Sequence, residues 1–85
     1  MPSISMFYGI VIYLYYLDHV PPHFHARYQD HEASFDLHGE VIEGSLPQKQ
    51  EKLVSAWALL HEEELEANWR LASEGQEPYR IDPLK

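Results

Sequence analysis

An alternation of apolar and polar residues between positions 23 and 38 constrains the fold of this 85-residue chain more than any other feature. In HFHARY (23–28) and in ASFDLH (33–38) every second residue is apolar. A period of two is typical of a β-strand that buries one face. The two segments therefore predict an antiparallel hairpin, with a tight turn at Asp30-His31.

The same pattern predicts the register of the hairpin, because a shift of one residue would move the apolar set to the other face. On the buried face we expect the pairs Tyr28 with Ala33, Ala26 with Phe35 and Phe24 with Leu37. On the opposite face we expect the pairs Arg27 with Ser34, His25 with Asp36 and His23 with His38.

The flanking segments predict the rest of a small α+β fold. The run Met6–Leu17 is rich in Ile, Val and Tyr and predicts one buried strand, which Pro21-Pro22 would end. A short edge strand is expected at Val41–Glu43. From Pro47 to about Ser73 apolar residues recur at helical spacing, and Gly75 follows as a helix end.

These elements predict a three- or four-stranded antiparallel sheet with one long C-terminal helix packed on one face. A chain of this length is expected to form a single domain over residues 1–85. Its parts would be a β-sheet part (1–44), the long helix (45–75) and an irregular tail (76–85).

Composition narrows the class of protein. The chain has no cysteine, so that neither a disulfide nor a thiolate metal ligand is available. No basic leader precedes the first apolar run, and that run is shorter than the roughly 20 residues that span a bilayer. We therefore expect a cytoplasmic protein with no membrane contact. The net charge of −8 argues against a general nucleic-acid binder and suits a basic partner protein.

The histidines predict a function for the hairpin. Five of the six lie between Asp18 and Gly39. Facing residues of a hairpin have Cβ atoms roughly 4.5–5.5 Å apart, within reach of one metal ion. Imidazole and carboxylate ligands suit zinc, nickel, copper or iron(II). One hypothesis is therefore a transition-metal site, for an ion such as zinc, made from His19, His23, His25, Asp36 and His38.

A second hypothesis needs no metal and no other cofactor. Histidine exchanges protons near neutral pH, so His25 oriented by Asp36 would act as acid or base. Arg27 and His23 would bind a phosphate, and a tyrosine such as Tyr28 would donate a hydrogen bond to it. Such a group predicts metal-independent cleavage of RNA.

The chain also resembles a known family. The run FYGI (7–10), the segment DHVPPHFHARY (18–28), EGSLP (43–47) and the tryptophan-bearing helix are similar to the bacterial family called domain of unknown function 4160. This resemblance implies membership of small two-gene modules of the toxin–antitoxin kind. It supports five residues of the shared motif as functional candidates: Asp18, His19, His23, His25 and Tyr28.

Together these observations predict a small component of a toxin–antitoxin-like module, bound to a cognate small protein encoded in the same operon. The sharper hypothesis is an RNA-cleaving toxin that acts through the histidine-rich sheet face. The alternative is a non-enzymatic interaction module or a transition-metal-binding module in complex with a partner protein.

Overall fold

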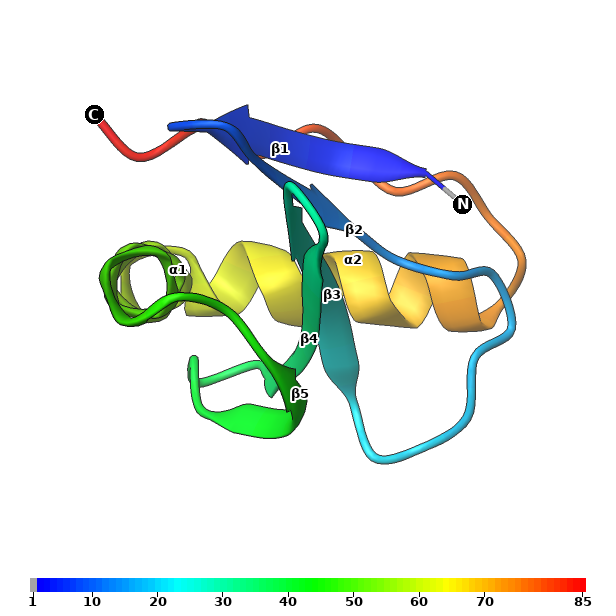
Figure 1. The fold of residues 1–85 in the computed structure, drawn as a ribbon. Helices are drawn as coiled ribbons and strands as arrows, with labels where there is room; N and C mark the ends of the chain where they lie inside the picture. Colours follow the sequence, from blue (N-terminus) through cyan, green and yellow to red (C-terminus); the bar gives the residue numbers. More distant parts are fainter. Residues whose placement is uncertain (1) are drawn as a thin grey trace.

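The computed structural model describes residues 2–85 and consists of a five-stranded sheet with two helices (Figure 1). The strands form an antiparallel meander in the order β1-β2-β3-β4-β5. The α+β class is confirmed, but the prediction of three or four strands and one helix is wrong. The strands are β1 (Ser3–Phe7), β2 (Ile10–Tyr13), β3 (His23–Tyr28), β4 (His31–Asp36) and β5 (Val41–Ser45). Residue 1 of the predicted domain lies outside the described residues.

The fifth strand arises because the run predicted as one strand, Met6–Leu17, contains the turn of the β1–β2 hairpin. Tyr8 and Gly9 form the turn, with positive φ angles of 49° and 78°. Two central residues with positive φ match the right-handed twist of the strands that they join. Glycine reaches this conformation without steric cost. Phe7 therefore pairs with Ile10 across a two-residue connection.

The β3–β4 hairpin has a different register from the predicted one. Its turn lies at Gln29-Asp30, where Gln29 has a φ of 53°, and not at Asp30-His31. The observed pairs are His23 with Asp36, Phe24 with Phe35, His25 with Ser34, Ala26 with Ala33, Arg27 with Glu32 and Tyr28 with His31. The register is displaced by two residues, so each side chain keeps its predicted face.

The predicted long helix is two helices, α1 (Gln48–Leu60) and α2 (Glu62–Ser73). His61 separates them with a non-helical φ of −128° and ψ of 29°. Figure 1 shows α1 along its axis while α2 crosses the view, so the chain turns sharply at His61. The bend lets Trp57 of α1 and Leu65 of α2 both enter the same core.

The core lies between the helices and one face of the sheet. Trp57 is fully buried, and its ring lies 5.4 Å from that of Phe7 and 5.8 Å from that of Phe24. The tail lies along this core: the Ile81 N–H donates to the Ile4 carbonyl at 2.7 Å, and the Trp57 Nε1–H donates to the Asp82 carbonyl at 2.8 Å. In residues 2–85, neither helix combines the length and apolar character needed to cross a membrane.

Candidate metal centre

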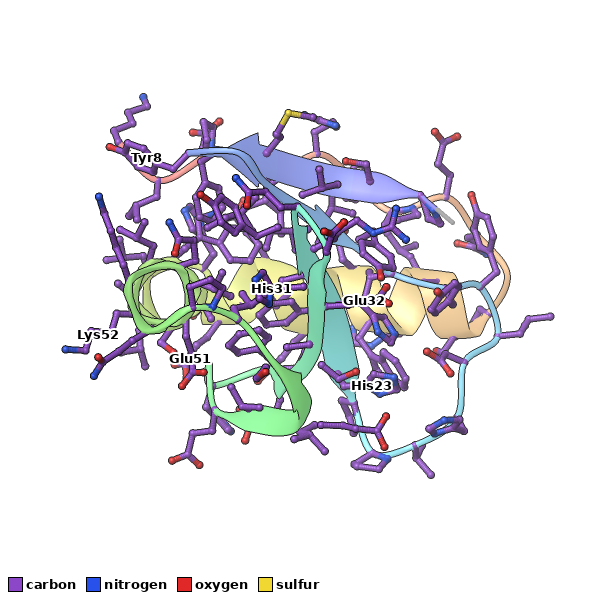
Figure 2. The ribbon with its side chains drawn as sticks, in the orientation of Figure 1. Tyr8, His23, His31, Glu32, Glu51 and Lys52 are labelled. Atoms are coloured by element: carbon purple, nitrogen blue, oxygen red, sulfur yellow. The ribbon has the colours of Figure 1, made fainter. Side chains whose placement is uncertain are left out.

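Two histidines of β3 point away from the core, on the same side of the sheet. His23 and His25 are two residues apart, and such residues share one face of a strand. Figure 2 shows His23 and Glu32 on the side of the sheet away from α1, and His31 on the side of α1. Trp69 of α2 packs against His23 with ring centroids 5.2 Å apart, which leaves only 5% of His23 exposed.

The loop between β2 and β3 brings Asp18 to these two rings. The N–H of Leu17 donates to the Ala72 carbonyl of α2 at 2.9 Å, which fixes the loop one residue before Asp18. The Asp18 Oδ2 atom then lies 2.9 Å from His23 Nε2 and 3.3 Å from His25 Nε2. Together, Asp18, His23 and His25 are called the triad below.

In both imidazole rings, the Nδ1 atom, which is not the one facing Asp18, contacts another group of the protein. His23 Nδ1 lies 2.7 Å from the Pro21 carbonyl, and His25 Nδ1 lies 3.2 Å from the Ser34 hydroxyl. A carbonyl oxygen only accepts hydrogen bonds, so His23 carries a proton on Nδ1. In neutral His23 the Nε2 lone pair would then face a carboxylate oxygen at 2.9 Å. A proton or a metal ion between these two atoms would remove this repulsion.

The electrostatics of Asp18 and His25 suit metal ligands. Burial raises the pKa of Asp18, but hydrogen bonds from the His19 N–H and from His25, and the charge of His23, together bring it below its usual value. Burial also lowers the pKa of His25 below 6.5, and the nearby Asp18 offsets this only in part. Asp18 is therefore anionic and His25 neutral at pH 7, which are the states that bind metals.

A cleft of about 260 Å³ opens beside the triad. The Tyr15 ring stands edge-on to His25, with centroids 4.7 Å apart. Beyond the triad, the cleft is lined by Tyr15, His19, Pro21, Ser34, Ile42 and Glu43. An ion held by the triad would therefore have one side open to a further ligand.

Two residues of the predicted metal set lie elsewhere. Asp36 pairs with His23 across the strands, but its Oδ1 atom accepts the N–H groups of His38 and Glu40 in the β4–β5 turn. The ring of His38 instead bonds Glu62 at 2.7 Å. Asp36 and His38 line a separate groove against α2.

The remaining candidates lie around the triad. His19 is adjacent: its Nε2 atom is 3.7 Å from Asp18 Oδ1, and its side chain is 82% exposed. Arg27 is one row away and faces Glu32 at 3.8 Å. Tyr28 lies at the far end of β3 and packs against the core.

The His38–Glu62 pair gives a pH-dependent prediction. The hydrogen bond to the Glu62 carboxylate raises the pKa of His38 above 6.5. The pair therefore favours the folded state fully below pH 6.5 and loses this effect as the pH rises through the higher folded-state pKa. We expect an NMR titration of the His38 ring to have its midpoint above 6.5, and Glu62→Gln to lower it. Equal midpoints in the two proteins would contradict the ion pair.

Comparison with known proteins places the chain in a family. A family model described as domain of unknown function (DUF4160) matches residues 9–70. The chain belongs to this family. The segment that matches the DUF4160 model contains all three triad residues. No curated protein and no solved structure matches the chain.

Sequence patterns indicated two triad residues as metal ligands but not the third. Asp18 appeared only as part of the motif shared with DUF4160, because it lies outside the alternating strands. Ser34, which contacts His25, was expected opposite Arg27. The sequence DHVPPHFH itself could have indicated Asp18 as a ligand, because it places this carboxylate five residues before His23, with two prolines between them.

Proposed function

We propose that this protein binds one divalent transition-metal ion through Asp18, His23 and His25. Zinc is the ion that we favour. The observation that carries this proposal is the convergence of one carboxylate oxygen and two Nε2 atoms, all within 4.8 Å of one another. Two imidazoles and one carboxylate form a known ligand set of catalytic zinc and of iron(II) sites.

The distances suit an ion of this size. Ligands about 2.0–2.2 Å from a tetrahedral ion lie about 3.3–3.6 Å from one another. The Asp18–His23 and Asp18–His25 contacts, at 2.9 Å and 3.3 Å, need only a small separation to reach this spacing. A bound ion would also supply the positive charge between His23 Nε2 and Asp18 Oδ2.

The groups that contact the Nδ1 atoms of His23 and His25 favour the same proposal. Metal-binding histidines usually present their other ring nitrogen to a carbonyl, a carboxylate or water, which fixes the tautomer and the ring orientation. Pro21 and Ser34 contact the Nδ1 atoms in this way. Three protein ligands and an adjoining cleft are typical of a site that exchanges its fourth ligand, whereas structural zinc sites are closed by four protein ligands.

RNA cleavage and membership of a toxin–antitoxin pair stay predictions. Cleavage was expected to use Arg27 as the phosphate-binding cation and Asp36 as the residue that orients His25. Arg27 faces Glu32, and Asp36 bonds the β4–β5 turn. The triad beside an open cleft supports the metal-binding alternative better, and this alternative is compatible with a partner protein.

Calorimetric titration of zinc into EDTA-treated protein tests the proposal. We expect saturable binding of one ion per chain. Asp18→Asn keeps the shape of the side chain but removes its charge, so this variant should bind much more weakly. The proposal fails if wild-type protein shows no saturable binding, or if Asp18→Asn binds as tightly as wild type.

A further inference from the structure

Glu43 lies on the same face of the sheet as the triad. It pairs with Ser34, whose hydroxyl contacts His25 Nδ1. Directly paired residues of antiparallel strands point to the same face, with Cβ atoms roughly 4.5–5.5 Å apart. The row across the sheet is therefore Tyr13, His25, Ser34 and Glu43. This row places a carboxylate on the edge strand β5, beside the cleft.

A bulge in β5 adds a second residue to the same wall. Ser34 pairs with Glu43 while the next residue, Phe35, pairs with Val41, so that Ile42 is the extra residue. Neighbours in a regular strand point to opposite faces, but a bulge re-aims one of them. Ile42 and Glu43 therefore both line the cleft, and Ile42 is 50% exposed.

The charges around the cleft influence which ligands bind in it. A divalent ion with the Asp18 carboxylate would carry one net positive charge, and Glu43 cancels it. Within residues 2–85, the lining of the cleft includes no lysine and no arginine. Arg27, on a neighbouring row, faces Glu32 at 3.8 Å. Tyr15, Pro21 and Ile42 form the apolar part of the other walls, and His19 and Ser34 form the polar part.

We propose that the open side of the metal site takes an uncharged or cationic ligand, and that Glu43 is the specificity-determining residue that disfavours anions such as phosphate. This inference rests on the proposed metal site. It assigns Glu43 a role through its charge and not as a metal ligand.

The test uses Co²⁺-loaded protein, whose visible absorption changes when a further ligand binds the ion. Imidazole is the uncharged probe and inorganic phosphate the anionic one. We expect wild-type protein to bind imidazole and to bind phosphate at least about tenfold more weakly. Glu43→Gln should raise the phosphate affinity about three- to tenfold, as expected for one charge removed at close range, and leave imidazole affinity within about twofold.

Glu40→Gln is the matched control, because it removes the same charge from the exposed turn before β5 and lies outside the cleft. An equal rise in phosphate affinity in both variants would overturn the proposal, since it would reflect net charge alone. A loss of Co²⁺ affinity in Glu43→Gln as large as that in Asp18→Asn would also overturn it, because Glu43 would then be a metal ligand and not only a nearby charge. Absence of Co²⁺ binding by wild-type protein would instead refute the metal site itself.

Discussion

His23→Ala is expected to lower the zinc affinity at least about 100-fold. Loss of a residue that merely supports a ligand costs about 10–100-fold in metal affinity, and His23 would be a ligand itself. Its Nε2 atom makes the shortest contact of the triad, 2.9 Å from Asp18 Oδ2. Competition with a chromogenic chelator measures the affinity of both proteins on one scale.

The matched control is His38→Ala. It also removes one imidazole, but the His38 side chain is 71% exposed and bonds Glu62, away from the triad. We expect its zinc affinity to stay within about twofold of wild type. Because His23 is buried, the circular dichroism spectrum and melting temperature of each apo variant must show that the fold survives. Equal losses in both variants would mean that zinc binds surface histidines in general.

The largest expected effect on stability comes from Trp57→Ala. The Trp57 ring is 0% exposed, contacts Phe7 and Phe24, and donates to the Asp82 carbonyl of the tail. Truncation of a buried tryptophan to alanine costs about 3–5 kcal/mol in the free energy of unfolding. Total stabilities of domains are only about 5–15 kcal/mol, and an 85-residue chain is small. We expect the variant to be largely or wholly unfolded at 37 °C.

Urea unfolding followed by circular dichroism measures this loss. Leu59→Ala is the control in the same helix, because Leu59 is 62% exposed and should cost less than about 0.5 kcal/mol. Trp57→Phe keeps a ring but loses the hydrogen bond to Asp82, so an intermediate loss is expected. A Trp57→Ala variant within about 1 kcal/mol of wild type would contradict the central place of Trp57 in the core.

The alternating pattern predicted which side chains share a face, but not which ones meet. The predicted register differs from the observed one by two residues. His23 and His25 therefore lie on the predicted outward face but pair with other residues across the strands than predicted. Hydrophobic periodicity does not distinguish registers that differ by two, so the turn decides between them. Gln29, with its φ of 53°, begins that turn, although glutamine carries no strong preference for positive φ.

The missed β-turn at Tyr8-Gly9 and the missed helix break at His61 have different causes. Tyr8-Gly9 lies within a continuous apolar run, which conceals a turn from any argument based on hydrophobicity. The sequence does contain an indication of the helix break at His61, because Glu62, Glu63 and Glu64 form an acidic first turn of α2. Acidic residues favour a helix N-terminus. The same carboxylates also suit the solvent-facing side of one longer helix.

Local sequence patterns could not predict the complete triad, because they do not determine the position of Asp18. Its position depends on the Leu17–Ala72 hydrogen bond, which joins a loop to a helix far along the chain. Such a contact leaves no periodic signal. The family resemblance identified Asp18 as a candidate, and the geometry brings it to within hydrogen-bonding distance of His23.

The most direct test of the metal site is an anomalous difference map at the zinc absorption edge, from crystals grown with one equivalent of zinc. We expect one strong peak about 2.0–2.2 Å from Asp18 Oδ2, His23 Nε2 and His25 Nε2, with the open side of the ion toward Tyr15 and Glu43. A map with its peaks only at exposed histidines such as His19, His31 or His38, and none within the triad, would contradict it.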